Sequence, residues 1–357
     1  YFNINKVPEG KHNLIVSFVG YDTLRTEIKM RKGGIVSKNF YLSPSSVILE
    51  EAVVSAEQRE KANRVQVSIT KIKPKEIKRL PTIGAEPDLA QYLQVVPGVV
   101  FTGDQGGQLY IRGGSPIQNL VLLDGMVIYN PFHSIGLFSV FDSDIIQSTD
   151  VYTGGFSAEY GGRISSVMDI RMRTGNKKRF AGKLSASPFG GKLLLEGPLK
   201  EFKQGESSAS YVVSAKTSYL NETSKYLYTY IEDSLPFSYT DIYGKINFTS
   251  PNGSKINLFG FNFNDKVSNY GALADLEWAS NGIGSNFVIV PSGSTVMIKA
   301  DFSYSDYEIG LTDPDQQNSS VMNRRSAIKG YNGGLDFVYF LGKNSFIWGI
   351  ETMGFRT

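Results

Sequence analysis

Residues 241–248 read Asp-Ile-Tyr-Gly-Lys-Ile-Asn-Phe, so polar and apolar side chains alternate along the stretch. Successive side chains of a β-strand point to opposite faces of a sheet. Asp241 and Lys245 therefore share one face, and Ile242 and Ile246 share the other. Lipid suits the apolar face and a water-filled lumen suits the polar one, as in a transmembrane β-barrel. The stretch predicts one strand of such a barrel.

The same alternation recurs in Tyr211 to Tyr219 and in Val296 to Phe302. We expect nine strands after Thr174, at about residues 180–188, 191–199, 208–219, 238–250, 254–264, 276–290, 295–308, 326–341 and 345–355. Single-chain bacterial barrels have an even number of strands, so nine strands do not close one. We therefore expect residues 176–357 to be the first strands of an incomplete barrel.

The connections between these strands are unequal in length. Short turns are expected at Pro251-Asn252-Gly253, Pro291-Ser292-Gly293 and Gly342-Lys343-Asn344, and longer loops at about 220–237, 265–275 and 309–325. Short turns at one end and long loops at the other are typical of outer-membrane barrels. A soluble β-sandwich is the alternative, but its strands are usually shorter and its connections less systematically unequal.

Composition supports a β protein and excludes several other classes. Aromatic residues make up 12% of the chain and glycine occurs 37 times, which favours strands joined by turns. The net charge is only +3, with both signs interspersed, so the chain lacks the basic patch of a nucleic-acid-binding protein. The absence of cysteine excludes disulfides and thiolate metal sites. His12 and His133 are far apart and no catalytic motif occurs, so we expect no metal, no cofactor and no enzyme.

Residues 65–175 predict a small mixed α/β domain. A helix is expected from Glu86 to Val96, with Pro87 in its first turn and Pro97-Gly98 after its end. Strands are expected at 109–112, 120–123 and 148–153, each ending near a glycine that can supply a turn with positive φ.

Four motifs of this domain resemble the plug domain of TonB-dependent outer-membrane receptors, in the same order and approximate spacing. They are LAQYLQVVPGVV (89–100), LYIRGGSP (109–116), LVLLDGMVIYNP (120–131) and VYTGGFSAEYGGRISSVMDIRMRTGN (151–176). The resemblance implies a mostly β protein with a plug over 65–175 and a barrel of 22 strands in the whole protein. The last motif departs from the starch-utilisation subgroup, which puts a lipoprotein lid in doubt.

The first 64 residues predict two further segments. Extended stretches at 11–21, 23–30 and 35–42 favour a small β-sandwich over residues 1–48, truncated at its N-terminus. FNINKVPEGKHNLIVSFVGY (2–21) resembles the carboxypeptidase-regulatory-like domain that precedes many receptors of Bacteroidetes type, although any immunoglobulin-like module is an alternative.

Residues 49–64 form a linker whose first octet, LEEAVVSA (49–56), resembles a TonB box. A short β-branched segment can pair with the exposed sheet edge of a partner. The alternative is a last strand of the preceding domain. The residues expected to contact a TonB-type energy transducer are Glu50, Glu51, Ala52, Val53, Val54 and Ser55.

The plug motifs also supply candidate site residues. We interpret one set as structural, because charged plug residues can pair with charged barrel walls and glycines can allow tight backbone geometry. This set is Arg112, Gly113, Gly114, Asp124, Gly125, Glu159, Gly161, Gly162 and Arg163. In the family, plug loops corresponding to residues 102–108 and 129–138 face the outside. From them we take as ligand-binding candidates Asp104, Gln105, Gln108, Tyr129, Asn130, Phe132 and His133.

The resemblance implies import of a scarce ligand across the outer membrane, with the plug and N-terminal domain on the periplasmic side. The implied partners are a TonB-type inner-membrane energy transducer, outer-membrane lipid and a small-molecule, glycan or peptide ligand. A non-transporting receptor, or a component of a larger envelope assembly, is the alternative, and a surface lipoprotein is a further possible partner. Nucleic acid is not expected.

Overall fold

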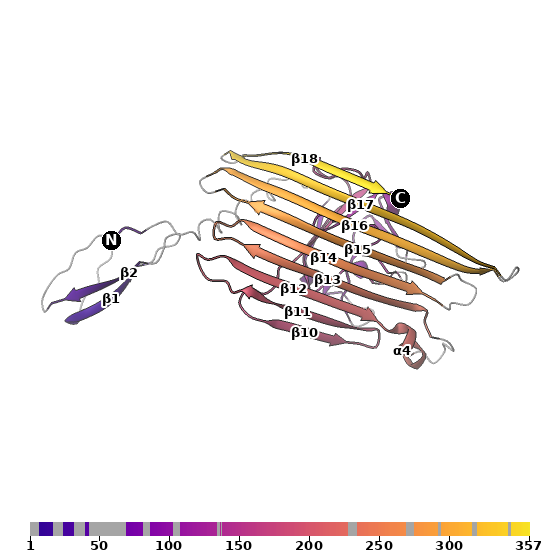
Figure 1. Cartoon of the computed structure of the whole chain (residues 1–357), viewed down its shortest axis with the longest axis horizontal. Coiled ribbons are helices and arrows are strands. Elements are labelled where there is room, and N and C mark those ends of the chain that lie inside the picture. The colour runs from indigo at the N-terminus through magenta and orange to yellow at the C-terminus, as the bar shows by residue number, and fades with distance from the viewer. Residues whose placement is uncertain are drawn as a thin grey trace.

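The computed structural model describes most of the chain (Figure 1). The described residues are 7–16, 24–31, 40–42, 69–80, 86–102, 108–133, 136, 138–227, 234–268, 275–291, 294–315, 320–341 and 344–357. The octet at 49–56 lies outside these ranges, as does most of the strand expected at 35–42. None of the described helices has the length and apolar character needed to cross a membrane.

All nine expected barrel strands are present, and they form one antiparallel sheet in sequence order (Figure 1). The strands are β10 (Ala181–Ala186), β11 (Gly190–Lys200), β12 (Ser208–Ser218), β13 (Phe237–Thr249), β14 (Lys255–Val267), β15 (Asp275–Ile289), β16 (Val296–Asp315), β17 (Ser320–Leu341) and β18 (Asn344–Arg356). β10 and β18 form its two edges.

The alternation that predicted these strands separates two faces of the sheet. In β13, Tyr243 and Lys245 are 4% and 5% exposed, whereas Ile242 and Phe248 are 44% and 42% exposed. The apolar side chains thus point away from the molecule and the polar ones point inward. This is the arrangement expected of a barrel wall between lipid and a polar interior.

Two of the expected loops contain regular structure. The loop expected at 309–325 is largely strand, because β16 and β17 stay paired as far as Asp315 and Ser320. The alternation of apolar and polar residues ends in this segment, because the segment lies beyond the lipid-facing band. The two strands still pair there, since hydrogen bonds between main chains do not depend on that alternation. The loop expected at 220–237 begins with α4 (Leu220–Leu227), which follows β12 directly.

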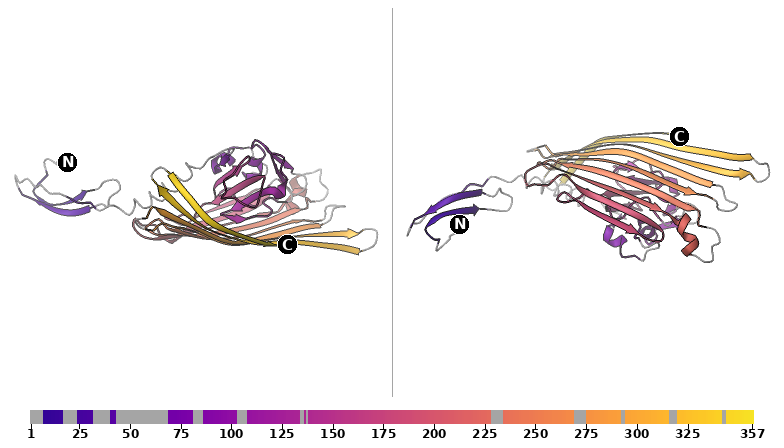
Figure 2. Two further views of the ribbon diagram at one scale, coloured as in Figure 1. Left: turned by 90° about the horizontal axis from the view of Figure 1, so that it is seen from above. Right: turned by 60° about the horizontal axis from the view of Figure 1, so that its bottom comes forward.

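The mixed α/β domain that the resemblance identifies as a plug lies against the inward face of the barrel sheet (Figure 2). Its main sheet has the order β3-β8-β9-β6-β7, in which only β6 and β9 are parallel. The strands are β3 (Ile69–Ile72), β6 (Asn119–Leu123), β7 (Met126–Val127), β8 (Ile146–Tyr152) and β9 (Ser166–Met172); a separate hairpin pairs β4 (Val99–Thr102) with β5 (Gln108–Ile111). The helices are α2 (Pro74–Ile77), α3 (Leu89–Leu93) and the 3₁₀ turn η1 (Pro116–Gln118).

Helix α3 is shorter than the sequence predicts. Asp88 caps it, because the Asp88 side chain accepts a hydrogen bond from the backbone N–H of Ala90 at 2.7 Å. Pro87 therefore precedes the cap instead of lying in the first turn. Leu89 and Leu93 are fully buried, so the apolar face predicted for this segment does pack into the core.

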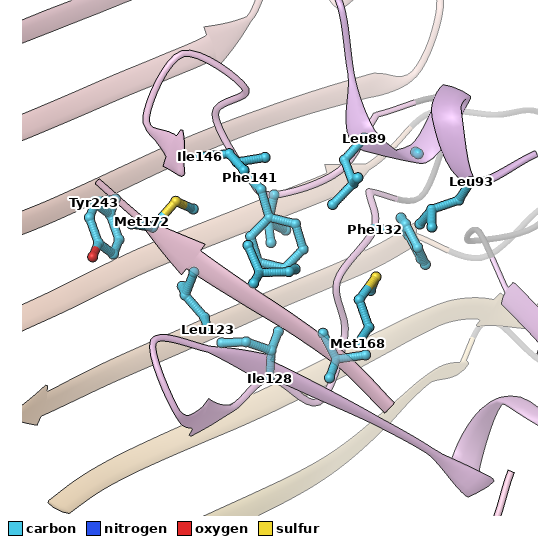
Figure 3. Close-up of a cluster of buried hydrophobic side chains, with 14 of the residues drawn as sticks. Leu89, Leu93, Leu123, Ile128, Phe132, Phe141, Ile146, Met168, Met172 and Tyr243 are labelled. Carbon is cyan, nitrogen blue, oxygen red and sulfur yellow. The ribbon is translucent and has the colours of Figure 1, made fainter. Parts of the chain in front are cut away.

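The plug core extends to the barrel wall. Leu123, Phe141 and Ile146 are buried in the plug, and Tyr243 of β13 joins the same cluster (Figure 3). Full burial of a side chain of this size contributes roughly 1.5–3 kcal/mol. The plug and the barrel sheet thus share one apolar cluster.

Near the N-terminus, β1 (Gly10–Val16) and β2 (Leu24–Met30) form an antiparallel pair, as the sequence predicts for the first two strands. Residues 40–42, the described end of the third expected strand, are not in a strand.

Candidate functional site: the contact between plug and barrel

A tight hairpin turn between β6 and β7 reaches the barrel wall. Asp124 and Gly125 form this turn with φ values of 50° and 89°. Two successive positive φ angles define a type I′ turn, which Asp-Gly sequences favour in two-residue hairpins. A β-branched residue at either position would be strained there.

The Asp124 side chain binds three groups, two of them from the barrel. Its carboxylate accepts hydrogen bonds from Tyr243 Oη at 2.5 Å and Lys245 Nζ at 2.9 Å, both on β13. Within the plug it accepts one from the backbone N–H of Met172 at 3.1 Å. The aspartate is 8% exposed and Lys245 is 5% exposed, so this is a buried ion pair. Removing one partner of such a pair is strongly destabilising, because the other charge stays buried.

The backbone of the same turn is also bound by the barrel. Asn286 Nδ2 on β15 donates to the Asp124 carbonyl at 3.0 Å. Asn332 Nδ2 on β17 donates to the Gly125 carbonyl at 3.2 Å. Three strands thus bind the tip of one plug hairpin.

A second contact is formed by His133, which is fully buried between two barrel carboxylates. Its Nε2 lies 2.8 Å from Asp241 Oδ2 and its Nδ1 lies 3.1 Å from Asp265 Oδ2. The ring stacks on Tyr239 at 3.8 Å between centroids and lies 5.8 Å from the Trp278 ring. With a carboxylate at each ring nitrogen, both nitrogens act as donors, which requires the protonated imidazolium.

Two opposing effects set the pKa of His133. Burial by itself lowers this pKa, but the charge of Asp241 and the hydrogen bonds to Asp241 and Asp265 raise it. The net pKa lies above the ordinary value of 6.5. The charged form of His133 is therefore the one that joins plug to barrel.

A third contact brings acidic plug residues against basic barrel residues. Lys192 Nζ on β11 lies 3.1 Å from Asp142 Oδ1 and 2.7 Å from Asp144 Oδ2. Lys183 of β10 also binds Asp144, at 2.7 Å. Burial raises the pKa of Asp144, but hydrogen bonds from Lys183 and Lys192 outweigh it and hold this pKa well below the usual range. Arg173 at the end of the plug forms a further ion pair with Glu196 of β11.

The ligand-binding candidates from residues 129–138 lie mostly between the plug and the barrel sheet. Tyr129 points at β17, since a Cβ placed on Gly330 would meet the Tyr129 hydroxyl. Asn130 Nδ2 donates to Tyr307 Oη at 3.4 Å. Phe132 is 1% exposed and His133 is fully buried, so neither presents a surface to a ligand in this structure.

The first group of ligand-binding candidates lies at the β4–β5 hairpin. Gln108 is exposed at the start of β5, where Tyr110 Oη donates to its side chain at 3.0 Å. Asp104 and Gln105 lie outside the described residues.

The structural candidates fall into three groups. Asp124 and Gly125 form the hairpin tip described above. The LYIRGGSP motif turns at Arg112 and Gly113, where φ is 47° and 81°. Gly114 allows a close approach, because a Cβ there would lie 2.1 Å from Ser165 Oγ.

The remaining structural candidates belong to the fourth motif, at residues 151–176. Glu159 and Gly161 are exposed, and Arg163 is half-buried and donates to the carbonyl of Gly162 at 2.8 Å. Gly162 lies next to β18, the last strand of the barrel sheet, because a Cβ on Gly162 would lie 3.9 Å from Met353 Sδ.

Sequence reasoning missed Asp142, Asp144 and Lys192. Lys192 occupies an inward position of β11. The alternation of side chains along this strand could therefore have predicted that Lys192 faces the interior. The partner of each charge could not be identified from the sequence, because the partners lie about 40 residues or more apart. Within the described ranges, no group of three or more His, Asp or Glu residues is placed to hold a metal ion.

Residues 61–167 match the family model described as TonB-dependent Receptor Plug Domain. This segment is a plug domain of the TonB-dependent receptor type. Residues 1–54 match the model described as CarboxypepD_reg-like domain, as the resemblance of the N-terminal strands implies. Among curated proteins, no sequence gives a significant match.

Solved structures of transporters and receptors share the fold of this chain. A copper transporter, OprC, matches with a TM-score of 0.60 at 13% identity, over 80% of this chain and 46% of that one. The siderophore receptor PirA from Acinetobacter baumannii matches with a TM-score of 0.58 at 14% identity, over 84% and 49%.

The FrpB iron transporter from Neisseria meningitidis matches with a TM-score of 0.58 at 15% identity, over 81% of this chain and 48% of that one. The chain thus spans about half the length of these structures. Its nine-stranded sheet shares the fold of part of the barrel wall in these structures, and the plug domain lies against the inward face of that sheet.

Proposed function

We propose that the complete protein imports a scarce ligand across the outer membrane by energy-coupled movement of the plug. The observation that carries the proposal is the way the plug is held. Asp124 and His133 bind the wall through buried hydrogen bonds and ion pairs. Such polar contacts can be exchanged for water when the plug is pulled, so only the apolar part of the interface, around Tyr243, loses its contacts without replacement.

The pull would be applied through Glu50 to Ser55, the segment that resembles a TonB box. A TonB-type transducer would bind this segment by strand addition, in which main-chain hydrogen bonds supply much of the affinity. The segment lies about a dozen residues before β3 along the chain, close enough in sequence for a pull to reach the plug sheet.

The ligand class is proposed from the neighbours. Their names describe copper, iron and siderophore transport. We therefore favour a scarce metal ion or its chelate over a glycan or peptide. The chain itself carries out no reaction in this proposal.

The decisive experiment deletes residues 49–56 from the full-length protein. Uptake of a radiolabelled ferric siderophore should fall to background, whereas binding of the same siderophore to whole cells should persist. The matched control replaces residues 57–64 by a Gly-Ser segment of equal length, and uptake should survive. Undiminished uptake after the deletion would contradict the mechanism.

A non-transporting receptor is the second candidate, favoured by the CarboxypepD_reg-like domain at residues 1–54. Such a domain offers a surface for docking to another envelope component. Purification from native membranes separates the two functions. A stoichiometric large partner, together with uptake that is insensitive to the deletion, would favour the second.

A further inference from the structure

A hydrogen-bonded row of polar side chains crosses the outer surface of the barrel sheet. Asn264 Nδ2 donates to Asn262 Oδ1 at 2.6 Å, and Asn262 Nδ2 donates to Asn281 Oδ1 at 2.6 Å. Asn281 Nδ2 in turn donates to Asp306 Oδ1 at 3.1 Å. The row therefore joins β14, β15 and β16.

This row faces away from the plug. Side chains alternate along each strand, and on β14 the neighbouring Asp265 points inward to His133. Asn264 and Asn262 must then point outward. The register pairs Asn262 with Asn281 and Asn281 with Asp306. Paired residues of neighbouring strands lie on the same face, so Asn281 and Asp306 also point outward.

A hollow of about 490 Å³ lies over the row. Its outward-facing lining includes Thr240, Asn264, Glu277, Asn281, Glu308 and Gly310. Gly310 lies opposite Glu277 and has no side chain, so the Glu277 side chain lies over it, and a Cβ on Gly310 would lie 3.4 Å from Glu277 Cγ.

The hollow begins where the lipid-facing band ends. Ile283 and Tyr304, two positions below Asn281 and Asp306 on the same face, are 67% and 38% exposed. On β16 the band runs from Val296 to Tyr304, and at about 3.3 Å per residue and a strand tilt of about 40° this spans about 20 Å of the roughly 25 Å height of a barrel's apolar band. The row therefore lies at the level of the lipid head groups on the long-loop side.

The chemistry of the lining favours sugars over bare phosphates. Carboxamides and carboxylates pair with hydroxyl groups as donors and acceptors. Glu277, Asp306 and Glu308 outnumber Lys266 and Arg325 among the outward-facing charged residues of the lining. Arg325 already lies 3.4 Å from Glu308, so its charge is partly balanced.

We propose that this hollow binds the sugar head of a glycolipid in the outer leaflet of the outer membrane. The site is on the lipid side of the wall, so it is separate from any ligand path through the plug. The carboxamides of the row would donate hydrogen bonds to the sugar hydroxyl groups and accept hydrogen bonds from them. The acyl chains of the same glycolipid would lie against the apolar band of the barrel wall.

The test uses the full-length protein, delipidated in a detergent without a sugar head, and native mass spectrometry with purified rough lipopolysaccharide as the probe. The double variant Asn262→Leu/Asn281→Leu should bind the probe about tenfold more weakly, because it loses several hydrogen bonds to the sugar. Gly310→Val should weaken binding because its side chain fills part of the hollow and displaces the Glu277 side chain that lies over Gly310. The control Ser285→Leu, on the same face within the apolar band, should bind normally.

Phosphatidylglycerol provides the second arm. It should bind the wild-type protein weakly and should not respond to these variants. Unchanged binding of lipopolysaccharide in both the double variant and Gly310→Val would overturn the proposal. Equal sensitivity of phosphatidylglycerol to the variants would also overturn it, because recognition would then not depend on the sugar. Heat-modifiable migration on gels verifies that each variant retains a folded barrel.

Discussion

The carboxylate of Asp124 at the tip of a plug hairpin lies 2.9 Å from Nζ of Lys245 in the barrel wall, with both side chains buried. The two residues are 121 positions apart in the sequence. Asp124→Asn removes the charge and leaves Lys245 buried without its carboxylate, so we expect plug binding to weaken by about 3 kcal/mol. Protease sensitivity of the plug in the full-length receptor measures this change.

Asp150→Asn is the control for that prediction. Asp150 belongs to the same plug sheet, but its register partners are Lys71 on β3 and Asp169 on β9. Its replacement should leave the protease sensitivity of the plug close to that of the wild type. Equal sensitivity of the two variants would show that the Asp124 contact does not hold the plug.

The contact at His133 should depend on pH. Its pKa is higher in the folded protein than the ordinary value of 6.5, so protonation stabilises the folded contact. This stabilisation is complete below pH 6.5 and is lost as the pH rises through the folded-state pKa. The plug should therefore become more protease-sensitive as the pH rises above neutrality.

His133→Gln should flatten this pH dependence, whereas His12→Gln in the N-terminal β1 strand should leave it unchanged. Protease sensitivity measured from pH 6 to pH 10 compares the two variants. If protease sensitivity in His133→Gln depended on pH as it does in the wild type, the pH dependence would come from another group.

Lys192 should matter far more than an exposed lysine. Lys192→Met leaves the carboxylates of Asp142 and Asp144 without their shared cation, and we expect a loss of about 3–5 kcal/mol. Lys200→Met removes an exposed pair with Glu206 at 4.0 Å and should cost about 0–1 kcal/mol. Urea unfolding of the refolded receptor in detergent measures both changes, and similar midpoints would contradict the prediction.

Gly114 should tolerate no side chain. The Cβ of Gly114→Ala would lie 2.5 Å from Ser165 Cβ, so the plug must shift, at a cost of about 1–3 kcal/mol. Gly155→Ala is the matched control, since a Cβ there meets nothing within 4 Å. Thermal unfolding should separate the two variants by several degrees. Identical unfolding temperatures would contradict the prediction, because they would mean that the chain around Ser165 can shift at little cost in free energy.

The barrel strands were predictable because their pattern has a strict physical cause. A side chain such as Ile246 must face lipid while Lys245 faces the interior, and this repeats every second residue. The β16–β17 extension beyond residue 308 was missed, because Asp313 and Pro314 are typical of loops and the strands no longer face lipid there. Local propensity alone does not reveal that two such segments remain paired.

The site was less predictable than the fold. Positive φ at Gly125 follows from the Asp-Gly sequence, but nothing in that dipeptide identifies Lys245 as the partner. His133 looked like a loop residue open to ligand, and the structure instead buries it between Asp241 and Asp265. Its burial depends on two strands more than 100 residues further along the chain.

The extended pairing of β16 and β17 has a practical consequence. The two strands remain hydrogen-bonded through Asp315 and Ser320, well past the lipid-facing band that ends near Tyr304. A paired ribbon is stiffer than a loop and would project from the cell surface. Antibodies raised against intact cells should find this ribbon accessible, and an epitope tag between Asp315 and Ser320 would report surface display without touching the plug.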